Sequence, residues 1–496
     1  MKFTNGFWLV RDEFQADYVR DIYEVEEREN ELLAFAPYKQ IQGRGDTLNI
    51  GMMTYTFTAP AKDILGIHMV NHAGNYVKSP SFELYGDLDK SPERKCEKAS
   101  GKEKWTLKSG KLSLEFETGS PEMKFYGDGR ELTCIKSKTT GMMHHKQGMN
   151  YLVSGLNLGV GELVYGLGER FTPMVKNGQT VDIWNEDGGT ASEISYKNIP
   201  FYYTTKGYGV FVNHPGRVSF EVGSEKVETV QFSVEDEELE YFVIYGPTPL
   251  EIIEKYTALT GRPALPPKWS FGLWLTTSFT TNYDEATVNS FIDGFEQRHI
   301  PLSVFHFDCF WMKGFEWCNF TWDKDMFPDP AGMLERFHKR GLKICVWINP
   351  YIAQKSPLFG EAMEKGYLLM KDNGRVWQWD MWQAGMGLVD FTNPDACSWY
   401  QSKLKALLDV GVDCFKTDFG ERVPTNVKWF DGSDPEKMHN YYTYLYNQCV
   451  FELLKKEKGE SEAVLFARSA APGGQKFPVH WGGDSTSQYI SMAETL

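Results

Sequence analysis

The sequence predicts a multidomain protein with a β domain and an α/β domain: an N-terminal β-sandwich followed by a (β/α)8 TIM barrel. Residues 1–245 contain short runs of alternating apolar and polar residues, broken by Gly, Asn, Asp and Pro, which is typical of antiparallel strands. Residues 269–496 contain apolar strand-like runs that alternate with amphipathic helices, which is typical of a helix-covered parallel sheet. The two patterns meet in a connector at 246–268.

The first part predicts a sandwich because its strand-like runs are short and closely spaced. Examples are "DTLNIGMMTYTFTAP" and "KWTLKSGKLSLEFETG", each bounded by residues that favour turns. The connector, "GPTPLEIIEKYTALTGRPALPPK", predicts a short helix followed by a Pro-rich stretch.

The second part predicts about six of the eight barrel strands. They are expected at 269–278, at 302–311, at 342–351, from 414 onward, in "AVLFARSA" and in "FPVHWGGD". Helices are expected at 284–298, in "PAGMLERFHKRG" and at 395–410, and an irregular, Trp-rich insertion at about 352–394. No glycine-rich dinucleotide turn is present, which favours a barrel over a doubly wound sheet.

The composition limits the classes of partner. The 52 basic and 67 acidic residues give a net charge of −15, which argues against nucleic acid or an anionic membrane as the main partner. Aromatic residues make up 15% of the chain, which suits sugar binding, although most of these rings are expected in the core. The eight cysteines lack CxxC spacing, so we expect reduced thiols and no metal site. Without an apolar run of signal-peptide or membrane-span length, a cytoplasmic protein is expected.

Polar side chains recur where the predicted barrel strands end, as in "CFKTDFGERVP" at 414–424. In a barrel, the carboxyl ends of the strands surround one mouth, where active sites are built. Any one of these residues could be a helix cap or loop residue, but their recurrence at successive strand ends indicates a site. The residues are Asp308, Asn349, Lys416, Asp418, Arg468 and Asp484.

Two carboxylates that face one pocket can cleave a glycosidic bond, one as nucleophile and the other as general acid and base. Asp418 shares a strand face with Lys416, and a nearby cation favours the carboxylate form that a nucleophile needs. Asp484 follows "HWGG", has aromatic neighbours and no adjacent lysine, so it is expected to hold a proton more easily.

Several ordered motifs resemble glycoside hydrolase family 31, a family of retaining α-glycosidases, over essentially the whole chain. They are "VYGLGERF", "NIPFY", "WSFGLWLTTSFTTNYDE", "CFKTDFGE", "LFARSA" and "HWGGD". The resemblance implies that Asp418 is the nucleophile and Asp484 the acid/base. It further implies that a sugar subsite is lined by Asp308, Trp347, Lys416 and Arg468, and reached by Asp187 on a loop from the sandwich.

The segment "HFDCFWMK" resembles the α-xylosidase branch of that family. Xylose lacks the hydroxymethyl group on C5, so a pocket narrowed by Cys309 and Phe310 would exclude glucose sterically. The alternative is that both residues only pack. Phe279, just past the first barrel strand, is expected on the leaving-group side.

The function expected from these residues is that of a retaining exo-α-xylosidase acting on small xylosylated oligosaccharides. Two alternatives remain open, an α-glucosidase of the same family and a non-catalytic carbohydrate-binding protein. Carboxylates and water suffice for the reaction, so no metal or organic cofactor is expected, and a homo-oligomer is possible. The histidine-aspartate motif of the family's seventh strand has no counterpart in the chain, so we expect a fragment of a longer enzyme or an incomplete gene product.

Overall fold

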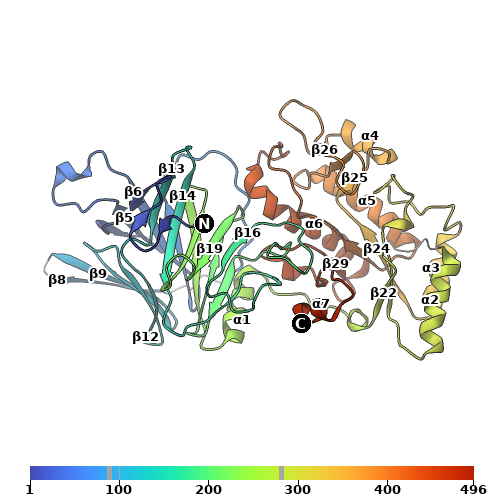
Figure 1. Cartoon of the computed structure of the whole chain (residues 1–496), viewed down its shortest axis with the longest axis horizontal. Helices are drawn as coiled ribbons and strands as arrows, with labels where there is room; N and C mark the ends of the chain where they lie inside the picture. Colours follow the sequence, from blue (N-terminus) through green and yellow to red (C-terminus); the bar gives the residue numbers. More distant parts are fainter. Residues whose placement is uncertain (87–91, 100, 279–283) are drawn as a thin grey trace.

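The computed structural model describes residues 1–86, 92–99, 101–278 and 284–496. A β-rich lobe, formed by the first half of the chain, lies beside a lobe of mixed helices and strands (Figure 1). The last strand of the β-rich lobe ends at Tyr245, and the first barrel strand begins at Trp274.

The described residues of the β-rich lobe form three antiparallel sheets and a short hairpin. The eight-stranded sheet has the order β15 (Val164–Gly166), β17 (Phe201–Thr204), β18 (Tyr208–Val212), β21 (Glu238–Tyr245), β7 (Ile64–Val70), β6 (Met52–Ala61), β5 (Glu31–Pro37) and β4 (Glu24–Glu27). The six-stranded sheet has the order β16 (Thr180–Ile183), β19 (Val218–Val222), β20 (Thr229–Val234), β14 (Asn150–Asn157), β13 (Gly141–His145) and β3 (Phe14–Tyr18). The five-stranded sheet has the order β12 (Arg130–Ile135), β11 (Met123–Gly127), β10 (Leu112–Glu117), β9 (Lys102–Ser109) and β8 (Glu93–Ala99), and the hairpin pairs β1 (Thr4–Asn5) with β2 (Leu9–Val10).

These sheets share one apolar core. Leu65 of the eight-stranded sheet, Leu152 of the six-stranded sheet and Leu114 of the five-stranded sheet are all fully buried in it. The alternating burial along β6 and β9 follows from successive side chains pointing to opposite faces. The predicted sandwich is therefore confirmed, with a third sheet added to it.

The expected connector helix is α1 (Pro249–Thr260). Thr248 caps it, and Pro249 occupies its first turn, where a missing N–H costs nothing. Ile252 and Tyr256 pack against Phe211 on the eight-stranded sheet, so this helix covers an outer face of the sandwich.

The second lobe is a parallel sheet of five strands in the order β22 (Trp274–Thr276), β23 (Val304–Phe307), β24 (Lys343–Ile348), β28 (Cys414–Thr417) and β29 (Leu465–Ala467). All four pairings are parallel, which confirms a partial barrel. The sixth expected strand is reduced to one parallel bridge between Ala467 and His480. Pro478 at its start has no N–H to donate to a ladder.

Four helices pack in the core that covers this sheet, namely α2 (Glu285–Gln297), α3 (Pro330–Lys339), α5 (Pro394–Val410) and α6 (Pro435–Lys458). The short helix α7 (Tyr489–Thr495) is mostly exposed. Short 3-10 turns add η1 (Arg44–Thr47) in the sandwich and η2 (Lys268–Phe271), η3 (Cys309–Trp311) and η4 (Gly474–Lys476) in the second lobe. Asp329, Asn393 and Asp434 cap helices that each begin with proline. The three expected helices are confirmed.

Two features differ from the sequence expectation. The insertion is ordered, with α4 (Pro357–Glu364) and a small sheet of β25 (Tyr351–Ile352), β27 (Met386–Leu388) and β26 (Gln378–Trp379). The 24-residue helix α6 was not predicted, because it is buried on several sides and lacks a simple apolar stripe. Figure 1 shows α6 on the side of the barrel lobe that faces the sandwich, whereas α2 and α3 lie on the far side.

All eight cysteines are unpaired. None of the helices in the described ranges is long and apolar enough to cross a membrane.

Candidate active site

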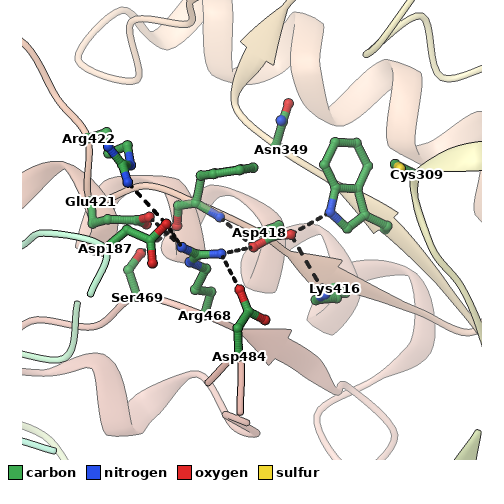
Figure 2. Close-up of polar contacts among 12 residues, drawn as sticks. Asp187, Cys309, Asn349, Lys416, Asp418, Glu421, Arg422, Arg468, Ser469 and Asp484 are labelled. Carbon is green, nitrogen blue, oxygen red and sulfur yellow. Dashed lines mark hydrogen bonds and ion pairs between the residues drawn. The ribbon is translucent and has the colours of Figure 1, made fainter. Parts of the chain in front are cut away.

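The parallel register brings the polar strand-end residues together. Trp347 of β24 is the direct neighbour of Lys416 in β28, and Asp418 follows β28 immediately. Asp308 follows β23, and Arg468 follows β29. Because the carboxyl ends of parallel strands meet at one edge, Lys416, Asp418 and Arg468 form a single cluster together with Asp484 (Figure 2). Asp308 joins this cluster through Lys416.

Asp418 is almost completely buried and fully engaged. Its Oδ2 accepts a hydrogen bond from the indole N–H of Trp347 at 2.6 Å and lies 3.7 Å from Lys416 Nζ. Its Oδ1 accepts from the Phe419 N–H at 2.9 Å and lies 3.2 Å from Arg468 Nη1. Burial alone would raise the pKa of Asp418, but the charges of Lys416 and Arg468 and the two N–H donors hold it below its usual value.

The backbone after Asp418 turns sharply. Phe419 adopts a φ of 57°, a left-handed conformation that is uncommon for a bulky residue and costs roughly 1–3 kcal/mol. Ser469 Oγ donates a hydrogen bond to the Phe419 carbonyl at 2.7 Å and holds this turn in place. The turn is what directs the Phe419 N–H back to the Asp418 carboxylate.

Arg468 is the central cation of the site, and its side chain is only 4% exposed. Its Nη1 lies 3.2 Å from Asp418 and 3.3 Å from Asp484, and its Nη2 lies 2.9 Å from both Asp187 and Glu421. One guanidinium group therefore joins four carboxylates, which come from the sandwich and from two barrel strand ends (Figure 2).

Asp484 differs from Asp418 in its environment. Its side chain is 66% exposed, and Arg468 is its ion-pair partner. Partial desolvation by the surrounding site, together with the negative charges of Asp418 and Asp187, raises the pKa of Asp484 in spite of Arg468 and Lys416. The site thus holds two carboxylates whose pKa values are displaced in opposite directions.

Lys416 joins Asp418 to Asp308. Its Nζ lies 3.4 Å from Asp308 Oδ2 and 4.4 Å from the centre of the Trp481 ring. Burial alone would lower the pKa of Lys416, but Asp418, Asp308 and Asp484 keep it above its usual value. Lys416 is therefore a fixed positive charge on the side of Asp418 away from Arg468.

Asp187 reaches the site on a loop that the barrel helix α6 holds. Asn440 of α6 accepts a hydrogen bond from the Asn185 N–H at 2.9 Å, and the His439 ring lies parallel to Trp184 with 3.6 Å between ring centres. Arg422 ion-pairs with Asp187 at 3.1 Å. The charges of Arg468 and Arg422 keep the pKa of Asp187 low although burial acts to raise it.

The other predicted residues lie at varying distances from this cluster. The Cys309 N–H donates to Asp308, and the thiol is buried, which raises its pKa. Phe310 packs against Trp317 with ring centres 6.1 Å apart. Asn349 is fully buried and donates to Gln383 at 2.9 Å, so it holds the insertion. Phe279 lies outside the described residues.

Four residues of the cluster had no role in the sequence prediction: Glu421, Arg422, Trp382 and Trp481. Glu421 and Arg422 directly follow the "KTDFG" turn, so proximity to Asp418 was the available signal. Trp382 of the insertion is 41% exposed and lies over Trp347, with ring centres 5.0 Å apart. The sequence places Trp382 in a loop and gives no sign that its ring packs against Trp347 of the barrel strand β24.

Among the described residues, no group of three or more His, Cys, Asp or Glu side chains could hold a metal ion. The cluster can instead supply a carboxylate nucleophile, a carboxylic acid and fixed cations, which is the equipment of acid–base and covalent catalysis.

Two protein-family models match the chain. The glycosyl hydrolase 31 N-terminal galactose mutarotase-like domain matches residues 54–221, and the glycosyl hydrolases family 31 TIM-barrel domain matches residues 263–496. The first range contains Asp187 and the strand β16 that precedes it. The second range contains Arg468 and its other partners, Asp418, Glu421 and Asp484.

The chain is similar to curated proteins and to solved structures. It is 55% identical to "Alpha-xylosidase XylQ" of Lactiplantibacillus pentosus, over 95% of this chain and 61% of that protein. It is 50% identical to an α-xylosidase of Emericella nidulans, over 100% of this chain and 66% of that protein, so it spans about three fifths to two thirds of these relatives.

A GH31 α-xylosidase from a soil metagenome, solved with xylose, shares the fold with a TM-score of 0.78 at 18% identity, over 95% of this chain and 69% of that one. The GH31 dextranase of Flavobacterium johnsoniae, solved with glucose, shares it with a TM-score of 0.83 at 23% identity, over 94% of this chain and 57% of that one. Together the two family models match well over half of the chain, and the chain belongs to glycosyl hydrolase family 31.

Proposed function

We propose that the protein is a retaining exo-α-glycosidase that releases α-D-xylose from the non-reducing end of xylosylated oligosaccharides. The relatives at 55% and 50% identity are both named α-xylosidases, which supports the choice of sugar.

The observation that carries this proposal is the arrangement of Asp418 and Asp484 around one nitrogen of Arg468. Their contacts to Nη1 are 3.2 and 3.3 Å long, so the two contacting oxygens lie no more than about 6.5 Å apart, the sum of the two contacts. Retaining glycosidases hold their carboxyl groups roughly 5–5.5 Å apart, whereas inverting enzymes need about 6.5–9.5 Å. The upper limit therefore favours retention.

The opposite pKa displacements assign the two roles. Asp418, with its lowered pKa, is ionised and attacks C1 of the sugar while the bond from C1 to the leaving oxygen breaks. Asp484, with its raised pKa, gives its proton to that oxygen, and the leaving alcohol departs. The product of this step is a xylosyl ester of Asp418.

Water completes the reaction. The Asp484 carboxylate takes a proton from a water molecule, whose oxygen attacks C1 as the ester bond to Asp418 breaks. Arg468 and Lys416 stabilise the Asp418 carboxylate that leaves, because both are within 4 Å of it. Xylose keeps its α configuration, and Asp484 regains its proton.

The first test separates the two carboxylates. Asp418→Ala should abolish turnover with every leaving group, because no covalent step remains. Asp484→Ala should lower turnover by about 10²–10⁴-fold for alkyl xylosides and much less for aryl xylosides with very acidic phenols, which leave without a proton. Steady-state kinetics over a series of aryl α-xylosides measures this, and an equal loss on all leaving groups would remove the acid assignment.

The second test addresses the sugar and the alternatives. The kcat/KM of the 496-residue chain is measured on an aryl α-xyloside and on an aryl α-glucoside. A higher value on the glucoside would show that the protein is an α-glucosidase and not an α-xylosidase. Calorimetry with the same sugars runs in parallel. Binding without turnover of either glycoside would instead favour a non-catalytic carbohydrate-binding protein.

A further inference from the structure

The ring of His439 on α6 lies between two segments that border the active site. Its Nε2 is 2.8 Å from the carbonyl oxygen of Asn185, in the loop that carries Asp187. Its Nδ1 is 2.7 Å from the carbonyl oxygen of Val423, in the turn that carries Arg422. Because Asp187 and Arg422 form an ion pair, both segments contribute to the position of the Asp187 carboxylate. The proposed mechanism gives His439 no role, although the residue is only 6% exposed.

Stacking fixes the orientation of this ring. The Trp184 indole lies parallel to the His439 ring, with 3.6 Å between ring centres and 2° between the planes. The Arg217 guanidinium lies 4.5 Å from the centre of the Trp184 ring. Trp184 directly precedes Asn185, and its carbonyl accepts a hydrogen bond from Asn198 Nδ2 at 2.9 Å. A ring confined in this way keeps its two nitrogens directed at the two carbonyls.

The protonation of His439 decides how many hydrogen bonds the ring donates. A neutral imidazole has one N–H and can donate to one carbonyl, whereas an imidazolium donates to both. Burial lowers the pKa of His439 to about 4, although the two carbonyls act to raise it, and the charge of Arg217 lowers it further. Near neutral pH the ring is therefore uncharged, and one hydrogen bond joins it to either the Asn185 or the Val423 carbonyl.

We propose that His439 is a positioning residue that holds Asp187 against Arg468 through this hydrogen bond. Asp187 lies 2.9 Å from Arg468 Nη2, and Nη1 of the same guanidinium lies 3.3 Å from Asp484. Besides burial and the charge of Asp418, the negative charge of Asp187 raises the pKa of Asp484. Displacing Asp187 should therefore lower the pKa of Asp484. The proposal rests on the proposed function, because that function makes Asp484 the acid.

The test is the pH profile of kcat/KM on an aryl α-xyloside with a weakly acidic phenol, which needs the acid in order to leave. Its basic limb reports the acid, and the Asp484 ionisation is the one that Asp484→Ala removes. His439→Phe keeps an aromatic ring beside Trp184 but removes the donor, so this limb should shift down by roughly half a pH unit. In an Asp187→Asn background, His439→Phe should cause no further shift, because the charge that His439 positions is gone. No shift in the wild-type background, or an equal shift in both backgrounds, would overturn the proposal.

Two amide variants test the hydrogen bond itself. His439→Gln can place an amide N–H near the position of Nε2, and His439→Asn can place one near that of Nδ1. Recovery of the wild-type limb by either variant supports the bond to the corresponding carbonyl, whereas recovery by neither would exclude this bond as the cause.

Tyr442→Phe is the matched control on the same helix. It removes one buried hydrogen bond of α6, which the Tyr442 hydroxyl donates to the Val389 carbonyl at 2.8 Å, and it does not touch the Asp187 loop. It should leave the limb unchanged. A shift in Tyr442→Phe equal to that in His439→Phe would assign the effect to the stability of the helix and overturn the positioning role.

A carboxyl titration keeps this test separate from the proposed function. NMR of protein labelled at the aspartate carboxyl carbons reads the pKa of Asp484 without turnover, and its signal is the one missing from Asp484→Asn. If the chain cleaves no xyloside, the catalytic proposal fails, while a lower Asp484 pKa in His439→Phe that vanishes in the Asp187→Asn background still supports the positioning role. An unchanged Asp484 titration would overturn it.

Discussion

Arg468 sets the charge balance of the site because a single guanidinium group contacts four carboxylates within 3.3 Å. All four have displaced pKa values: Arg468 and neighbouring cations lower those of Asp187 and Asp418, whereas burial raises those of Asp484 and Glu421. The sequence had placed Asp418, Asp484 and Arg468 at one barrel mouth. It could not show that the fourth carboxylate, Glu421, shares the same cation.

Glu421 is the residue that we expect to position Arg468. It is fully buried 2.9 Å from Arg468 Nη2, and burial raises its pKa to about 7 despite this contact. Glu421→Gln should lower kcat by roughly 10–100-fold, because a displaced Arg468 misplaces both catalytic carboxylates. Near pH 7 the wild-type pH–rate profile should contain an ionisation that the variant lacks.

Glu421→Gln should lower activity but make the unfolding free energy less sensitive to rising pH. A carboxyl group whose pKa is raised on folding lowers the unfolding free energy as the pH rises from about 4.3, its pKa in the unfolded chain, to about 7, its pKa in the folded protein. Wild type should therefore lose unfolding free energy over this range, and Glu421→Gln should lose less. Thermal melts at several pH values measure it, with Glu460→Gln, 85% exposed, as the control. Identical pH–rate profiles for Glu421→Gln and wild type would exclude the positioning role.

At the scale of elements, helix α6 joins the barrel to the loop that carries Asp187. Asn440 on this helix accepts from the Asn185 N–H and donates to the carbonyls of Ile183 and Gly216 at 3.1 Å each. All of these contacts are between the two lobes. The helix therefore fixes the position of the sandwich loop relative to the barrel mouth.

We expect Asn440→Ala to lower the unfolding free energy by roughly 2–4 kcal/mol, because it leaves a buried N–H and two buried carbonyls unpaired. Urea unfolding measures this effect, and Lys456→Ala on the exposed side of α6 is the control, expected within about 0.5 kcal/mol of wild type. Asn440→Ala should also raise KM, because it removes the acceptor of the Asn185 N–H, and Asn185 is two residues from Asp187. A stability equal to that of Lys456→Ala would show that the junction does not depend on this side chain.

The strands and helices of the barrel were predicted more completely than its connections. The helices at 284–298 and 395–410 follow from local spacing of apolar residues and caps, so they could be read from the sequence. The helix α6 buries Tyr442 and Tyr446 against the barrel and His439 and Asn440 against the sandwich loop, so its pattern has no single apolar face. The sequence did not predict α6 because its burial depends on the packing of two lobes, which leaves no local pattern of apolar residues.

At the scale of the whole molecule, the junction between the lobes contains a buried charge cluster. Asp236 of the sandwich lies 2.5 Å from Lys437 of α6 and 3.0 Å from His214. Burial alone would raise the pKa of Asp236, but hydrogen bonds and charges from His214 and Lys437 bring it well below its usual value. The charge of Asp236 therefore stabilises the joined lobes.

This cluster predicts acid sensitivity. A carboxyl group with a lowered folded pKa contributes stability above its unfolded pKa of about 3.9, and this contribution is lost as the pH falls further. Wild type should therefore lose more unfolding free energy than Asp236→Asn between about pH 5 and pH 2. Circular dichroism melts across this range measure the difference, with Asp325→Asn, 78% exposed, as the control. Parallel curves for wild type and Asp236→Asn would contradict the prediction.

The sequence alone determined the two-part fold and the strand ends that carry Lys416, Asp418 and Arg468, because alternation of apolar residues and motif spacing act over short distances. Only the tertiary structure decided which groups share one cation, since Asp187, Asp418, Glu421 and Asp484 come from segments separated by up to nearly 300 residues. The sequence had predicted the directions of the pKa displacements of Asp418 and Asp484 from their neighbours, but the tertiary structure supplied causes that it did not contain, such as burial, Arg468 and the Trp347 N–H. These depend on burial and on distances between charges, and both quantities exist only once the sandwich and the barrel are packed together.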